Sequence, residues 1–216
     1  MSVAEVAAHE GQAGAGDAGL SHPVTSTGLS NEKLAMWAFL GSECLLFGAL
    51  ISTFILFRNR PVGGSLRPQD VYDIPFTSVS SFVLLMSSLT MVLALAAIQR
   101  GDEAKLRVWL MATALLGMIF ISGQVYEFTR FVQDGMTIKT NVIASSFFTL
   151  TGFHGAHVTG GIIMLLSLFG MSLDGRLPVE KAEAVELVGL YWHFVDIVWI
   201  VIFTVVYLIP QPKPPG

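Results

Sequence analysis

Five long apolar stretches constrain what this chain of 216 residues can fold into. A helix needs about 20 mostly apolar residues to cross roughly 30 Å of hydrocarbon, and each stretch is long enough to do so. Inside a bilayer the backbone polar groups must bond within the segment, which favours helices. The sequence therefore predicts an all-α, polytopic membrane protein, a bundle of five transmembrane helices. They are expected at residues 34–57, 76–98, 106–131, 141–171 and 185–209.

The remaining sequence leaves no room for a soluble catalytic domain beside a membrane domain at 34–209. Only 13% of the residues are charged, about half of what soluble domains usually carry. Residues 1–28 are rich in Ala and Gly and contain no Lys or Arg, so they lack the basic start of a secretory signal. We expect 1–33 to be a mobile tail, with a partner-docking arm as the alternative, and 210–216 to be a proline-rich tail.

Charge and cysteine content exclude several classes of function. Cys44 is the only cysteine, so neither an intrachain disulfide nor a thiolate metal cluster can form, and we interpret it as a small packing residue. The chain has a net charge of −4 and no stripe of basic residues, which argues against nucleic acid as a partner. Basic loop residues divide equally between the two sides of the predicted helices, so loop charge favours neither orientation.

Ionisable residues inside the predicted spans are the main candidates for function, because such groups are costly at membrane depth. Glu43, in AFLGSECLLFGAL, is either a proton-linked or lipid-contacting carboxyl or an acid hydrogen-bonded to a neighbouring helix. His193 and Asp196 are three residues apart in LYWHFVDIVWIVIF. That pair suits a proton relay, since histidine titrates near neutrality, or a lock between two helices.

A third group follows one helix face near the end of the third predicted span. Gln124, Glu127 and Arg130 lie three residues apart in SGQVYEFTRF. Residues at this spacing are neighbours on a helix surface, so Glu127 and Arg130 can pair. The pattern favours a structural interfacial cluster over a catalytic acid.

The segment TGFHGAHVTGG at 151–161 has two distinct faces. Gly152, Ala156 and Gly160 form a small-xxx-small stripe that predicts close approach of another helix. His154 and His157 lie opposite, and we expect them to hydrogen-bond in a polar layer shared with His193 and Asp196.

The histidine count limits the metal chemistry of the chain. Two of its five histidines, at positions 9 and 22, are in the N-terminal tail. The six ligands of a haem–copper catalytic subunit are therefore not available. A single haem held between His193 and His154 or His157 remains a membrane-anchor alternative.

Four segments in order resemble one known family. FFTLTGFHGAHVTGG, followed after a loop by YWHFVDIVWIVIFTVVYL, resembles the paired signature of subunit III of haem–copper terminal oxidases, the cytochrome c oxidase subunit III family. The SEC segment of the first span and GQVYEFTRF of the third are similar to the same family in the same order. The resemblance covers about residues 33–209 and is to the five-helix form.

The resemblance implies a non-redox subunit that docks mainly on oxidase subunit I, with subunit II and others in the complex and haem and copper in those partners. Its implied role is to stabilise subunit I and to support proton uptake. The implied location is the bacterial inner membrane, multi-pass, with the amino terminus cytoplasmic.

Residue by residue, Glu43 corresponds to the family's intramembrane carboxyl. The remaining polar positions match His154, His157, His193, Asp196, Gln124 and Glu127. A bound phospholipid is compatible with the family, and Trp37 and Arg58 are the candidates to contact it.

We therefore predict subunit III of a bacterial aa3-type cytochrome c oxidase, a proton-translocating oxidoreductase complex of aerobic respiration. A quinol oxidase subunit III and the related accessory protein of nitric oxide reductase are the alternatives within the family. The electron donor binds other subunits, so these proteins share the features above. A proton-linked transporter is the alternative from another class, although the chain has neither an internal repeat nor paired broken helices.

Overall fold

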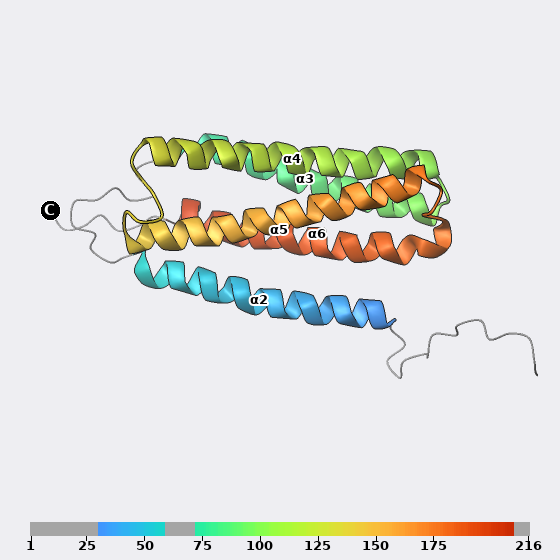
Figure 1. Cartoon of the computed structure of the whole chain (residues 1–216), viewed down its shortest axis with the longest axis horizontal. Coiled ribbons are helices and arrows are strands. Elements are labelled where there is room, and N and C mark those ends of the chain that lie inside the picture. The colour runs from blue at the N-terminus through green and yellow to red at the C-terminus, as the bar shows by residue number, and fades with distance from the viewer. Residues whose placement is uncertain (1–29, 59–71, 210–216) are drawn as a thin grey trace, which may run out of the picture. The chain divides into compact units, whose positions relative to one another are not determined.

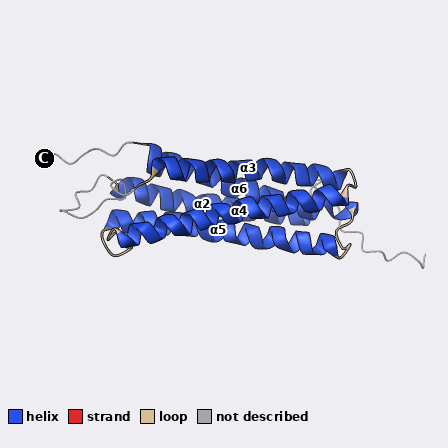
Figure 2. Ribbon diagram, turned by 90° about the horizontal axis from the view of Figure 1, so that it is seen from above, coloured by secondary structure: helices blue, strands red, loops and turns tan. Residues whose placement is uncertain are grey.

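The computed structural model describes residues 30–58 and 72–209, and in these ranges it contains helices but no strand (Figure 2). Five helices are long and apolar enough to cross a membrane, which confirms the predicted fold class. Their bounds lie within three residues of the predicted ones when the last helix is taken through residue 208, where its final short turn ends. The helical elements are α2 (Asn31–Phe57), α3 (Ile74–Gln99), α4 (Glu103–Gln133), α5 (Val142–Leu173), η2 (Val179–Lys181), α6 (Ala182–Phe203) and the π-helical turn η3 (Thr204–Leu208) (Figure 1).

The chain divides into two compact units, residues 1–35 and 36–216. In the first unit, the described part is the start of α2, where the Ser30 hydroxyl accepts a hydrogen bond from the Lys33 N–H at 3.2 Å. Residues 31–33 are therefore helical, whereas we expected them to belong to the tail. The rest of that predicted tail and the proline-rich tail at 210–216 lie outside the described residues.

Glycine ends three of the helices in the same way. Gly101, Gly135 and Gly175 follow α3, α4 and α5 with φ of 72°, 90° and 66°, a conformation that residues with a Cβ rarely adopt. In each case the next N–H bonds back to a carbonyl five residues earlier, as in Met136 N–H to Phe131 O at 2.8 Å. These Schellman motifs satisfy carbonyls that would otherwise have no partner.

Polar side chains cap the starts of α4 and α5. Asp102 directly follows Gly101, and its carboxylate accepts from the Lys105 N–H at 3.1 Å to begin α4. Asn141 caps α5 in the same way through the Ala144 N–H, at 2.7 Å. Such caps satisfy N–H groups of the first helical turn. The sequence RGD at 100–102 thus joins two membrane helices with a very short turn.

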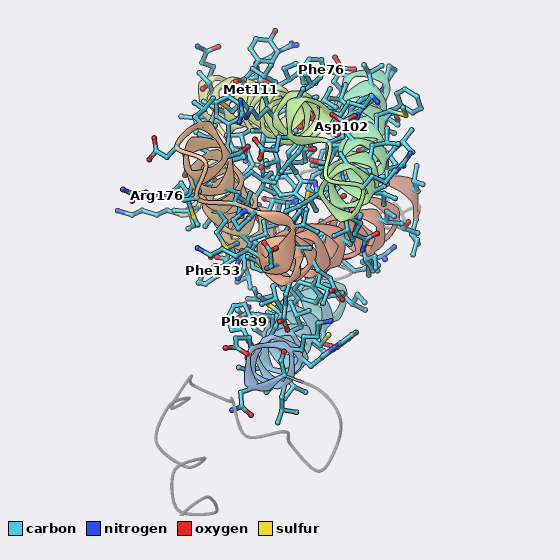
Figure 3. All side chains as sticks on the ribbon, turned by 90° about the vertical axis from the view of Figure 1, so that its right-hand side faces the viewer. Phe39, Phe76, Asp102, Met111, Phe153 and Arg176 are labelled. Atoms are coloured by element: carbon cyan, nitrogen blue, oxygen red, sulfur yellow. The ribbon has the colours of Figure 1, made fainter. Side chains whose placement is uncertain are left out.

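Within residues 36–216, α3, α4, α5 and α6 form a closed ring in which each helix packs on the next and α6 returns to α3. Figure 3 looks along this ring, and the ribbon of α2 lies beside it. Aromatic contacts join α2 to α5 and α6: the ring of Phe47 lies 5.0 Å from that of His157 and 6.3 Å from that of Phe194. The core therefore lies inside a four-helix ring that α2 flanks.

Trp192 of α6 fills the centre of the ring and is fully buried. Its indole lies against Gly117 of α4 and Gly161 of α5, and its Nε1–H donates to the Ser87 hydroxyl of α3 at 2.9 Å. A buried indole N–H normally finds such a partner. One side chain of α6 therefore contacts the other three helices of the ring.

Large apolar side chains are exposed on the outer faces of the helices. Leu45, Val79, Phe82 and Ile163 each expose 60% or more of their surface, which suits contact with lipid rather than water. Cys44 is also exposed, so the interpretation of this residue as a packing residue is wrong for the contacts within this chain.

Candidate functional site

Glu43 and His157 form a hydrogen-bonded pair that joins α2 to α5 inside the membrane domain. Nε2 of His157 lies 3.0 Å from Oε2 of Glu43, and the two side chains are 16% and 14% exposed. The two residues lie 114 positions apart in the sequence. This contact is a hydrogen bond to a neighbouring helix, which is one of the roles predicted for Glu43.

The second ring nitrogen of His157 fixes where protons can lie in this pair. Nδ1 lies 2.8 Å from the backbone carbonyl of Phe153, and a carbonyl can only accept, so Nδ1 carries a hydrogen. The hydrogen bond between Nε2 and Glu43 then needs a further proton, on the imidazole or on the carboxyl. The two groups therefore share one proton across this hydrogen bond.

Aromatic side chains enclose the Glu43–His157 pair. Phe47 meets the imidazole edge-on, at 65° between the ring planes. Tyr191 of α6 donates from its hydroxyl to the backbone carbonyl of His157 at 2.9 Å, and its ring stacks with Phe39 of α2 at 6.2 Å. These contacts place the pair where α2, α5 and α6 meet.

A second polar cluster joins α3 to α6 through Ser88. The Ser88 hydroxyl donates to Oδ2 of Asp196 and lies 3.0 Å from Nδ1 of His193. Because its one hydrogen goes to Asp196, the hydroxyl accepts from Nδ1–H of His193. A serine of another helix therefore bridges the two residues that the sequence placed three apart.

The sequence interpretation missed the serines of α3. Trp199 of α6 donates from Nε1 to the Ser81 hydroxyl at 2.9 Å, and Ser87 and Ser88 bind Trp192 and Asp196. The signal was available in TSVSSFVLLMSSLT, where two serine pairs recur seven residues apart and so return to one helix face.

The predicted cluster on α4 forms with different partners from those expected. Glu127 accepts a hydrogen bond from the hydroxyl of Thr77 on α3. The guanidinium of Arg130 lies instead over the Tyr126 ring, 6.0 Å from its centre. The expected Glu127–Arg130 pairing is therefore wrong. Both Gln124 and Glu127 are 6% exposed, and each joins α4 to a neighbouring helix.

His154 does not share in the hydrogen-bonded layer that we expected. It is fully buried, stacks on Trp199 at 4.8 Å and meets Phe120 edge-on at 5.9 Å. Neither ring nitrogen has a hydrogen-bond partner in the described part of the chain. The expected single layer is thus divided into the Glu43–His157 pair, the Ser88 cluster and a histidine among aromatic rings.

The predicted glycine stripe packs against no helix of this chain. A Cβ on Gly152 would have no neighbour within 4 Å, and one on Gly160 would meet only the Tyr191 hydroxyl, at 3.5 Å. Ala156 is exposed. The tight contacts belong to other glycines: a Cβ on Gly155 would lie 2.8 Å from Oε1 of Gln124, and one on Gly161 2.7 Å from Trp192. The tight helix contacts within this chain therefore lie on a different face of α5 from the predicted stripe.

The described residues contain no cluster of metal ligands, and of the two candidates for lipid contact only Trp37 is well exposed. Among them, no three His, Cys, Asp or Glu side chains gather closely enough to hold an ion. Trp37 is 55% exposed, whereas Arg58 is 8% exposed and donates from Nη2 to the Ile209 carbonyl at 3.4 Å.

Comparison with known proteins identifies the family. The sequence model of the family described as cytochrome c oxidase subunit III matches residues 16–210. The chain belongs to the cytochrome c oxidase subunit III family. The prediction made from four short segments is therefore confirmed, and the match extends beyond both ends of the predicted membrane domain.

Relatives of the chain carry two kinds of name. It is 37% identical over 178 residues to cytochrome c oxidase subunit 3 of Bacillus sp. (strain PS3), covering 82% of this chain and 86% of that protein. It is also 37% identical over 175 residues to quinol oxidase subunit 3 of Bacillus subtilis (strain 168), covering 81% and 85%. Cytochrome bo(3) ubiquinol oxidase subunit 3 of Pseudomonas aeruginosa is 33% identical, covering 91% and 93%.

Family membership defines the class of protein. Members are subunits of haem–copper terminal oxidases, which are oxidoreductase complexes, and subunit III is not itself catalytic. Together with the five apolar helices, this makes the chain a multi-pass membrane subunit of a respiratory oxidase.

Proposed function

We propose that this chain is subunit III of a bacterial aa3-type cytochrome c oxidase, which stabilises subunit I and supports proton uptake during reduction of oxygen to water. Its main contact is subunit I, with subunit II and others in the same complex, and haem and copper belong to those subunits. It lies in the bacterial inner membrane with its amino terminus in the cytoplasm, and lipid covers its outer apolar faces.

The Glu43–His157 pair carries the proton-linked part of this proposal. Nδ1 of His157 donates to the Phe153 carbonyl, so the contact of 3.0 Å between Nε2 and Glu43 requires a proton of its own. A carboxyl and an imidazole that share one proton can take it up and release it at little cost in geometry. Ionisable groups at membrane depth line proton pathways for this reason.

Replacement of one carboxyl tests this role in the assembled oxidase. Glu43→Gln keeps a group that can donate to Nε2 of His157 but removes the titratable acid. We expect the complex to assemble normally and its oxygen turnover to fall, with an altered pH profile. Glu103→Gln is the matched control, because Glu103 pairs with Arg107 at the exposed start of α4. Identical pH profiles for the wild type and Glu43→Gln would reject the proton-linked role.

The electron donor needs a separate experiment, because the two Bacillus relatives described above are equally similar to this chain. The complex purified through a tag on this chain should oxidise reduced cytochrome c and show the absorption bands of haem a. Oxidation of quinol, with no activity toward cytochrome c, would assign the chain to a quinol oxidase instead.

A further inference from the structure

A hollow of about 240 Å³ lies at one end of the helix ring, between the start of α3 and the last turns of α4. Its walls include Asp73 and Phe76 at the start of α3 and Tyr126, Glu127 and Arg130 of α4. The rings of Phe76 and Tyr126 lie 5.5 Å apart. Aromatic residues gather at the ends of membrane helices, where the bilayer meets water. The hollow therefore lies near the level of the lipid headgroups.

Glu127 brings a buried carboxylate into this hollow. The residue is 6% exposed, and its Oε1 accepts a hydrogen bond from the Thr77 hydroxyl. Oε2 keeps some accessible surface and has no hydrogen-bond partner in the described part of the chain. Because buried charges in proteins are normally paired, this second oxygen is suited to a cationic donor from another molecule.

Arg130 brings the opposite charge into the same hollow without pairing with Glu127. The central carbon of its guanidinium lies 6.0 Å from the centre of the Tyr126 ring. A guanidinium can bind a phosphate through two parallel N–H groups. Residues three apart on a helix have Cβ atoms about 5–6 Å apart. The hollow thus places a site for an anion beside a site for a cation.

A zwitterionic headgroup fits these charges better than other ligands. A primary ammonium has three hydrogens to donate to the carboxylates of Glu127 and Asp73, and in phosphoethanolamine only two carbons separate it from the phosphate. A purely anionic headgroup would face both carboxylates. Within the described ranges, no three His, Cys, Asp or Glu side chains lie close enough to hold a metal ion. A basic side chain of a protein partner would meet the guanidinium of Arg130.

Apolar surface for acyl chains continues from the hollow toward the middle of α4. Ile119 and Leu115 precede Tyr126 by seven and eleven residues, so all three follow one face of the helix. They are 56%, 48% and 52% exposed. This continuity favours a membrane lipid over a soluble phosphoethanolamine as the occupant.

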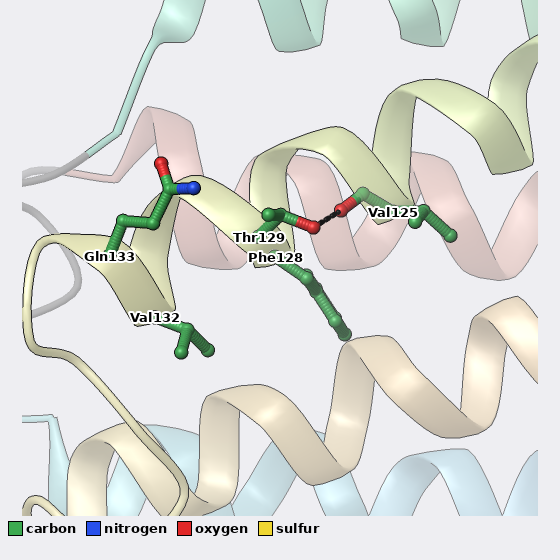
Figure 4. Close-up of a pocket in the computed structure, with 5 residues that line it drawn as sticks. All are labelled: Val125, Phe128, Thr129, Val132 and Gln133. Atoms are coloured by element: carbon green, nitrogen blue, oxygen red, sulfur yellow. Dashed lines mark hydrogen bonds between the residues drawn. The ribbon is translucent and has the colours of Figure 1, made fainter.

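A larger hollow beside another face of α4 lacks such selectivity. It has a volume of about 380 Å³, and Figure 4 shows the residues that line it. The Thr129 hydroxyl there donates to the Val125 carbonyl of its own helix at 2.8 Å, and no described residue of the lining is charged. An acyl chain can occupy this space, but nothing in it distinguishes one headgroup from another.

We propose that the hollow between α3 and α4 binds a phospholipid with a primary ammonium headgroup, of the phosphatidylethanolamine class. The ammonium lies against Glu127 and Asp73, and the phosphate lies against Arg130. This inference goes beyond the proposed function, since it requires the membrane domain alone and applies with either electron donor. The site is also distinct from Trp37 and Arg58, the candidates for lipid contact considered above.

Lipid titration of the delipidated full chain, read by native mass spectrometry, tests the selectivity. We expect one dioleoyl-phosphatidylethanolamine to bind about tenfold more tightly than dioleoyl-phosphatidylglycerol or dioleoyl-phosphatidylcholine, because charged hydrogen bonds contribute about that much. Phosphatidylglycerol has no ammonium, and the ammonium of phosphatidylcholine has no hydrogen to donate. Equal affinities for the three lipids would overturn the proposal. Soluble glycerophosphoethanolamine binding as tightly as the lipid would overturn the assignment to a membrane lipid.

Two substitutions separate the two halves of the site. Glu127→Gln keeps an oxygen for the Thr77 hydroxyl but removes the charge, so the preference for phosphatidylethanolamine should disappear. Arg130→Gln should weaken binding of all three lipids about tenfold and leave the order of preference unchanged.

Matched controls make the same changes at exposed ion pairs. Glu103→Gln on α4 and Arg176→Gln after α5 should leave every lipid affinity unchanged. A preference for phosphatidylethanolamine that survives Glu127→Gln, in a chain folded by circular dichroism, would overturn the proposal. Because the Arg130 side chain is exposed, its replacement tests the site even if Glu127→Gln fails to fold. Unchanged affinities for Arg130→Gln would likewise overturn the proposal.

Discussion

The indole of Trp192 occupies the space beside Gly161 where a Cβ would stand, with Cε3 and Cζ3 2.7 Å from that position. The same ring comes within 2.6 Å of the corresponding position at Gly117. Contacts this short are not compatible with a real Cβ, so the two glycines are what allow α4 and α5 to close around the indole. The centre of the ring therefore depends on one large residue and two residues without side chains.

Gly161→Ala should destabilise the protein although alanine is the better helix former. Alanine gains about 1 kcal/mol in helix propensity, but overpacking a filled core costs about 1–3 kcal/mol. We expect a net loss of about 1 kcal/mol, measured as a Tm lower by about 2–4 °C in detergent. Gly152→Ala is the control, because its added Cβ has no neighbour within 4 Å, and its Tm should not fall. A Tm for Gly161→Ala at or above that of wild type would contradict this account of the core.

Ser88→Ala should weaken the contact between α3 and α6. The substitution removes the hydroxyl that donates to Oδ2 of Asp196, a residue that is 3% exposed. A buried acceptor left without a hydrogen bond lowers the stability of the fold by about 1–3 kcal/mol, a loss that thermal unfolding in detergent would detect. Ser167→Ala is the matched control, since the Ser167 hydroxyl is exposed and bonds only to the Ile163 carbonyl of its own helix. Equal losses of stability in the two variants would argue against the Ser88 cluster as a helix lock.

The fold could be predicted from the sequence because the length of an apolar stretch is set by the thickness of the bilayer. The ends of the helices follow from equally local rules: Gly101 and Gly135 supply the left-handed turn, and Asp102 and Asn141 supply the caps. What the sequence does not encode is which side of each helix faces inward. A membrane helix is apolar all round, so the usual contrast between a polar and an apolar face is lost.

In the candidate site, too, some features could be predicted from the sequence and others could not. Depth along a helix follows from counting residues, and Glu43, His157, His193 and Asp196 were correctly recognised as polar groups within the spans. Their partners depend on rotation and neighbour order, which bring His157 to Glu43 and give Asp196 to Ser88. The glycine stripe is a further case, because whether it faces a helix of this chain also depends on the rotation of α5.

Acid should reduce the stability that the cap of α4 provides. The side chain of Lys105, 2.7 Å from Asp102, and the backbone N–H of the same residue lower the pKa of the Asp102 carboxyl from its usual value. A carboxyl with a lower pKa in the folded state stabilises the fold fully above the unfolded pKa, about 3.9. That contribution is lost as the pH falls through the folded pKa.

Asp102→Asn keeps a capping oxygen without the charge, so its Tm should depend less on pH than that of the wild type between neutral pH and pH about 3. Asp174→Asn, at the exposed turn after α5, controls for loss of one surface carboxylate. Parallel Tm curves for wild type and Asp102→Asn would show that this cap does not contribute to acid stability.

A double-mutant cycle at Glu43 and His157 should measure the bond that joins α2 to α5. Hydrogen bonds between membrane helices contribute about 0.6 kcal/mol on average and up to about 1.7 kcal/mol. We expect a coupling energy in that range between Glu43→Leu and His157→Leu, from unfolding in mixed detergent. The control cycle pairs Glu43→Leu with Thr159→Val, because the Thr159 hydroxyl bonds to the Gly155 carbonyl of its own helix. The effects of substitutions at distant sites on the unfolding free energy add within about 0.5 kcal/mol. Equal coupling in the two cycles would therefore mean that the Glu43–His157 contact, at 3.0 Å, adds nothing to the attachment of α2.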